Sequence, residues 1–128
     1  MPSRPLSPHL SVYKFKYTLT TSILNRFTGV GLSLGLLVLV YWLVAVAGGA
    51  AAQQRAQRWL GLPLFKVIMA AFVFAFCYHL LAGIRHLVWD SGRGLERAQS
   101  QRSAWLIVIV SLLLTLALGY GLWHGRAV

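Results

Sequence analysis

Acidic residues are almost missing from this sequence. Asp90 and Glu96 are the only two among 128 residues, against 12 lysines and arginines. Both lie in or beside the polar connector that follows the second of three apolar runs, so no carboxylate stands well inside an apolar run. Proton-coupled multidrug transporters typically need an acidic residue within a membrane span. The scarcity of acids therefore argues against that class of protein.

Cysteine is scarcer still, and the first residues do not have the pattern of a signal peptide. Cys77 is the only cysteine, so this chain alone can build neither a disulfide nor a cysteine-ligated cluster. Residues 1–21 are polar, contain prolines and lack the short apolar core of a signal peptide. We therefore expect residues 1–20 to form an arm at the inner membrane surface, with the first helix leading the chain into the membrane.

Apolar residues dominate the rest of the chain. They make up 58% of the sequence and gather in three runs that are each long enough to span a bilayer. The sequence predicts an all-α integral membrane protein with three transmembrane helices, at about 21–48, 64–89 and 104–124. The net charge of +10 does not indicate nucleic-acid binding, because the basic residues lie between and beside the runs, as topology signals and partners of lipid headgroups do.

The positions of the basic residues predict the orientation of the helices. With three crossings, the N-terminal arm and the second connector share one side of the membrane. Eight cations lie on that side and four on the other: Arg4, Lys14, Lys16, Arg26, Arg85, Arg93, Arg97 and Arg102 against Arg55, Arg58, Lys66 and Arg126. Because cytoplasmic loops carry the excess of Lys and Arg, we expect the N-terminus on the cytoplasmic or matrix side.

The second apolar run contains an ionisable residue. Such a side chain near the bilayer centre costs roughly 2.5–3.5 kcal/mol, so His79 is expected to bind something. Steps of four and seven residues nearly return to one angle on a helix, which places Gly83 and His86 on the same face as His79. A flat ligand such as haem could lie against the bare backbone of Gly83. His79 could instead be a neutral residue hydrogen-bonded to a neighbouring helix, and both interpretations stay open.

The spacing of the two histidines limits any haem site. They lie about 10 Å apart along the helix axis, which is too far for both to ligate one iron. A haem held by His79 would need its opposite ligand from another helix. His86, with Arg85 beside it, would lie nearer the membrane surface, where cationic groups could meet the haem propionates.

The first apolar run begins with a second polar pair. Ser22 and Arg26 are one turn apart on a shared helix face, so a hydroxyl and a guanidinium stand together just inside the membrane boundary. An arginine at a helix end commonly reaches out to lipid phosphates, and Arg26 could do so here.

Three stretches of the chain resemble the signature motifs of a known family. They are RPLSPHL at 4–10 with Tyr13 following, SILNRFTG at 22–29, and HLLAGIRHL at 79–87 followed by Asp90. Together and in this order they are similar to the cytochrome b subunit of succinate dehydrogenase. The resemblance covers nearly the whole chain and includes its length and its three crossings.

The resemblance implies a membrane anchor without a complete active site of its own. It would pair with a second three-helix anchor subunit and hold an iron–sulfur subunit and a flavoprotein subunit on the inner face of the membrane. Electrons from succinate would pass to ubiquinone, or to menaquinone. His79 matches the axial ligand of a haem b whose other ligand comes from the partner anchor. Ser22 and Arg26 match the quinone pocket, and Arg26 and His86 match groups near the haem propionates.

One position departs from the family pattern. The family usually has histidine before the arginine of the first helix, and here that residue is Asn25, which can hydrogen-bond but carries no charge at neutral pH. A haem-free structural anchor of a quinone-reactive complex, or of a fumarate reductase, remains the alternative function. We expect the protein in the bacterial inner (plasma) membrane in preference to the mitochondrial inner membrane.

Overall fold

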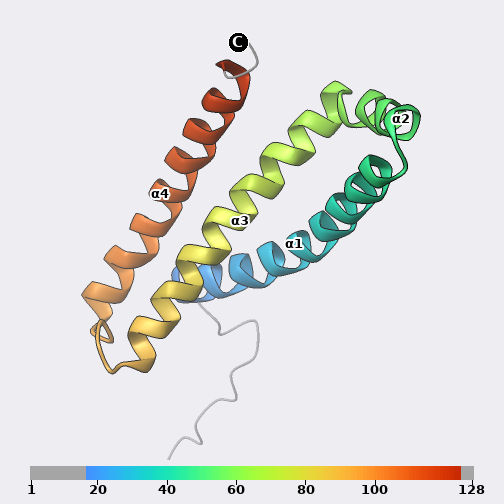
Figure 1. Cartoon of the computed structure of the whole chain (residues 1–128). Helices are drawn as coiled ribbons and strands as arrows, with labels where there is room; N and C mark the ends of the chain where they lie inside the picture. The colour runs from blue at the N-terminus through green and yellow to red at the C-terminus, as the bar shows by residue number, and fades with distance from the viewer. Residues whose placement is uncertain (1–16, 125–128) are drawn as a thin grey trace, which may run out of the picture.

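Long helices form almost the whole of the described chain. The computed structural model describes residues 17–124, with side chains for residues 19–121. Within that range the helices are α1 (Tyr17–Ala47), α2 (Ala50–Leu60), α3 (Pro63–Asp90) and α4 (Arg97–His124). Figure 1 shows α3 between α1 and α4, and α3 packs against both of them.

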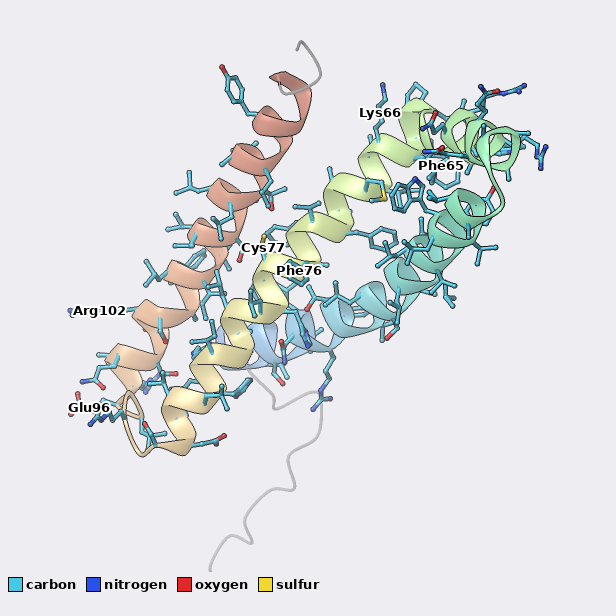
Figure 2. All side chains as sticks on the ribbon, viewed as in Figure 1. Phe65, Lys66, Phe76, Cys77, Glu96 and Arg102 are labelled. Atoms are coloured by element: carbon cyan, nitrogen blue, oxygen red, sulfur yellow. The ribbon has the colours of Figure 1, made fainter. Side chains whose placement is uncertain are left out.

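Three of these helices are long and apolar enough to cross a membrane. The candidate spans are Leu19–Ala47, Pro63–Asp90 and Arg97–Gly121. This confirms the prediction of an all-helical chain with three spans. Lys66 lies at the α2 end of α3, whereas Glu96 and Arg102 lie at the opposite end, around the turn into α4 (Figure 2). Lys66 and Arg102, which the charge count assigns to opposite sides of the membrane, therefore stand at opposite ends of the helices.

The boundaries of the helices differ from those predicted. The expected arm at 1–20 falls mainly on residues 1–16, outside the described residues, while residues 17–20 already belong to α1. Helix α4 begins at Arg97 and not near Ala104, so the connector predicted at 93–103 is partly helical. Alanine, glutamine and arginine are good helix formers, and a helix can continue past the end of an apolar run.

The short helix α2 was not predicted. Residues 49–63 were expected to be a simple link, but Ala50–Leu60 is rich in alanine, glutamine and arginine and forms three turns. Gly49 precedes it with φ of 84°, a backbone angle that favours glycine, and Pro63 opens α3 directly after it. In Figure 1, α2 is seen along its axis while α1 and α3 are seen from the side, so α2 turns across the ends of both helices.

The α3–α4 interface contains the apolar core. Tyr78, Ala82 and Ile107 are buried together, and Leu24 of α1 packs against them. Small residues on α4 let the two backbones approach, since Ala104 is 4% exposed and Ser111 is fully buried with its hydroxyl donating to the Ile107 carbonyl. Close packing of α3 on α4 therefore fixes the helix that carries His79.

The C-terminal end of α3 and the start of α4 are joined by a polar clamp. Arg85 donates from Nη2 to the carbonyl and the hydroxyl oxygen of Ser100, at 2.9 and 3.1 Å, and its Cζ lies 4.0 Å from the centroid of the Trp89 ring. The Trp89 indole in turn donates to the carbonyl of Gly94 at 3.0 Å. This clamp holds the turn at Ser91–Glu96, where Gly92 and Gly94 both have positive φ.

Candidate functional site

His79 lies on the side of α3 that faces α1. Its Nδ1 is 3.2 Å from the backbone carbonyl oxygen of Asn25 and 3.3 Å from the hydroxyl oxygen of Thr28. Thr28 is only 6% exposed and donates its own hydroxyl to the same Asn25 carbonyl at 2.9 Å. The first turns of α1 therefore surround one nitrogen of the imidazole.

The other nitrogen of the ring is differently placed. Among the described residues, Nε2 of His79 makes no hydrogen bond, and the residue as a whole is half-buried. An imidazole with one nitrogen held by the protein and one without a protein partner is the usual arrangement of a histidine ligand. The contacts of Nδ1 join two helices, and Nε2 is left without a partner in the described residues.

Gly29 allows this close approach. A Cβ atom at this position would lie 3.2 Å from Cε1 and 3.7 Å from Nδ1 of His79. The first of these distances is tighter than an ordinary van der Waals contact, so a side chain at 29 would displace the ring or the helix. The imidazole lies directly over the backbone of α1 because residue 29 is glycine.

The rest of the expected face on α3 is open. Gly83 and His86 are both exposed, and a Cβ on Gly83 would meet no atom within 4 Å. The His86 ring makes an edge contact with Trp89, with 5.2 Å between centroids and 79° between planes. Arg85, expected beside His86 near the propionates, is instead turned toward α4 and held by Ser100. Position 85 comes 100° after position 84 and 100° before 86 on a helix, so neighbours in sequence face different sides.

Ser22 and Arg26 are exposed at the start of α1. Arg26 lines an open hollow of about 300 Å³ together with Ile23, Phe27 and Val30. All four residues belong to α1, so this hollow is an open depression on the surface of a single helix. Ser22 lies one turn before Arg26 and does not line the hollow.

Two contacts of His79 were missed by sequence reasoning. Thr28 and Gly29 lie inside the SILNRFTG motif, yet only Ser22 and Arg26 were selected from it as site residues. The available signal was their spacing: positions 25, 28 and 29 share one helix face, on the opposite side from Ile23 and Phe27. Nothing in the sequence alone showed that this face meets His79.

Metal ligation by a cluster of residues is not seen in residues 17–124. No group of three or more His, Cys, Asp or Glu side chains comes together in this part of the chain. Cys77 is buried and its thiol is free.

Comparison with known proteins gives one consistent match. Residues 1–118 match the family model of the succinate dehydrogenase/fumarate reductase transmembrane subunit. The chain is 41% identical over 115 residues to the succinate dehydrogenase cytochrome b556 subunit of Rickettsia typhi, covering 90% of each chain. It is 40% identical over 116 residues to the same subunit of Paracoccus denitrificans, covering 88% of this chain and 86% of that one. It is also 34% identical to the mitochondrial cytochrome b560 subunit of Bos taurus, over 91% of this chain and 70% of the other.

These matches establish the class and the family of this protein. The class is a multi-pass subunit that anchors a respiratory complex in a membrane. The chain belongs to the succinate dehydrogenase/fumarate reductase transmembrane subunit family. The resemblance seen in the three motifs is thereby confirmed, and this subunit is a membrane anchor that does not itself hold the catalytic site.

Proposed function

We propose that this chain is the cytochrome b membrane anchor of a succinate dehydrogenase, in which it helps to bind haem b and quinone and docks the flavoprotein and iron–sulfur subunits. Family membership and the cytochrome b names of the relatives support the anchor role. The haem assignment rests on the two ring nitrogens of His79: α1 holds Nδ1, whereas Nε2 has no partner in residues 17–124.

The residues of this chain fit a haem. His79 would hold the iron by Nε2, together with a histidine of the partner anchor. The exposed backbone at Gly83 offers room for a flat ring, because a Cβ there would meet no other helix and no nearby side chain of the described residues within 4 Å. Arg26 and His86 would contact the propionates. His86 is exposed about one turn beyond Gly83, toward the C-terminal end of α3. When bound, the haem supplies a carrier for one electron at a time.

Quinone binding is assigned to Ser22 and Arg26. The serine hydroxyl would donate to a quinone oxygen, and the guanidinium would stabilise negative charge as the quinone is reduced. The hollow beside Arg26 is lined by three apolar residues and open to a neighbouring chain, which suits a hydrophobic ring with polar edges. A headgroup contact of Arg26 is the alternative, and activity measurements distinguish the two.

The orientation follows from the charge count and supports this assembly. Tyr78 donates to the carbonyl of Thr21, and His79 contacts that of Asn25, so the segment of α1 that carries Ser22 and Arg26 lies beside the C-terminal half of α3 (Figure 1). With that end of the helices on the cytoplasmic side, quinone and haem sites lie close to the soluble subunits that deliver electrons. The bacterial relatives favour the inner (plasma) membrane of a bacterium as the location.

A substitution at the ligand tests the proposal. His79→Ala in the assembled complex should abolish the low-spin b-type signal in the reduced-minus-oxidised spectrum, because the iron loses its ligand from this chain. His124→Ala, at the last residue of α4, is the matched control and should leave the signal intact. If His79→Ala keeps the wild-type spectrum, or if a complex of normal composition contains no haem, the chain is a structural anchor only.

A further inference from the structure

The surroundings of Nδ1 determine where the proton of His79 resides. A hydroxyl has one hydrogen to donate, and that of Thr28 is directed to the Asn25 carbonyl at 2.9 Å. Toward His79, the Thr28 oxygen can therefore only accept. The Asn25 carbonyl is also an acceptor without any hydrogen. Both groups within 3.3 Å of Nδ1 consequently require a donor on the ring.

A neutral imidazole has one N–H and one lone pair. When Nδ1 carries the hydrogen, the lone pair is on Nε2, the nitrogen without a partner in the described chain. The close contact with Gly29 then restricts rotation of the ring, since Cε1 lies against the α1 backbone. Tautomer and orientation are thus both set by α1, a helix more than 50 residues away in sequence.

We propose that Thr28 and the backbone carbonyl of Asn25 are positioning groups that keep the proton on Nδ1 of His79, so that Nε2 faces the haem iron. This inference rests on the proposed function and adds residues to which that proposal gave no role. It also bears on the unusual Asn25. The group that contacts His79 is the backbone carbonyl, which any residue at position 25 would supply, so the exchange of histidine for asparagine leaves this contact in place.

The proposed contacts have a measurable effect on a bound haem. A hydrogen bond from Nδ1–H makes the ligating nitrogen more basic and orients the ring, and loss of such a partner typically weakens metal binding by about 10- to 100-fold. A more basic ligand favours the oxidised iron. Removing the Thr28 hydroxyl, one of the two acceptors, should therefore raise the midpoint potential of the haem and reduce its retention.

The first test exchanges the hydroxyl of Thr28. Thr28→Val keeps the branched shape and removes the oxygen, whereas Thr28→Ser keeps the oxygen and removes only the methyl group. In the purified complex, we expect Thr28→Val to raise the haem midpoint potential and to lower the haem content after detergent washing, and Thr28→Ser to restore both. Wild-type values in Thr28→Val, or equal changes in both variants, would overturn the role of the hydroxyl.

The second test moves the ring without removing a hydrogen-bonding group. Gly29→Ala places a Cβ 3.2 Å from Cε1 of His79, while Gly31→Ala on the same helix meets no atom within 4 Å. We expect Gly29→Ala to shift or broaden the low-spin electron paramagnetic resonance signal of the haem and Gly31→Ala to leave it as in the wild type. Equal signals in the two variants would contradict the positioning role of α1.

The results separate the two proposals. A wild-type haem spectrum in His79→Ala would rule out His79 as the haem ligand and, with it, the haem-binding part of the proposed function. Loss of the spectrum in His79→Ala, combined with unchanged potential and resonance signals in Thr28→Val and Gly29→Ala, would leave the ligand in place and overturn only the positioning role.

Discussion

The two interfaces of α3 differ in kind. Toward α4, α3 is closed by buried groups of this chain itself: Tyr78, Ala82 and Ile107 pack together, and Arg85 is held by Ser100. Toward α1, the packing is partly apolar, with the Phe72 ring against Gly35, and partly polar, through His79. An open surface at Gly83 and His86 lies beside this contact. One side of α3 is complete without a partner, and the other side carries the groups that a haem and a second subunit would contact.

This contrast separates stability from function along a single helix. Tyr78 and His79 are adjacent, yet a step of 100° places one in the apolar core and the other at the ligand side. The closed α3–α4 pair gives the histidine a rigid support. We therefore expect substitutions on the α4 side to lower the stability of the protein, and substitutions on the open side to impair haem or quinone binding.

The largest effect is expected in the closed interface. Ile107→Ala removes a buried side chain and should lower the free energy of unfolding by about 2 kcal/mol or more. Ile109→Ala, at an exposed position of the same helix, is the matched control and should cost much less. Thermal inactivation of the detergent-solubilised complex measures both. If the two variants inactivate at the same temperature, α3–α4 packing does not provide the support described here.

The next effect is expected at the open side, in activity and not in stability. The double variant Ser22→Ala, Arg26→Ala should reduce quinone reductase activity roughly 10- to 100-fold, because charge-assisted hydrogen bonds contribute about 1.5–3 kcal/mol. The haem spectrum should persist, since His79 is untouched. Arg102→Ala, at another exposed arginine near the same membrane boundary, is the control. Full activity of the double variant would favour a lipid-headgroup role for Arg26.

The smallest effect is expected at Gly83. The added methyl of Gly83→Ala meets nothing within this chain, and alanine favours a helix over glycine by roughly 0.5–1 kcal/mol, so the fold should tolerate it. A porphyrin lying against the backbone would meet that methyl, and we expect a modest loss of haem content. Gly119→Ala has equally open surroundings and serves as the control. Identical haem content in both variants would place the haem away from Gly83.

The fold was largely predictable because its dominant signal is local. Apolar runs longer than 20 residues can be satisfied in a bilayer only as helices or closed barrels, and the three runs became α1, α3 and α4. The exceptions were polar segments. Helix α2 and the first turns of α4 have strong helix formers but little apolar character, so apolar runs in the sequence do not predict them.

The candidate site was predictable in its residue types and less so in its contacts. His79 stood out because an ionisable group in an apolar run is costly, and Gly83 followed from helical spacing. The orientation of the Arg85 side chain could not be predicted from helical spacing, because its partner Ser100 belongs to the next helix. The roles of Thr28 and Gly29 could not be predicted for the same reason, since both depend on a contact with α3.

By itself, the sequence determined three membrane spans, the polar residues that interrupt them and the family to which the chain belongs, because hydropathy and motif spacing are properties of neighbouring residues. Only the tertiary structure decided which nitrogen of His79 is held, by which groups of α1, and that Arg85 serves the α3–α4 turn. Those contacts join residues on different helices, and their geometry depends on how the helices pack and not on the period of either one.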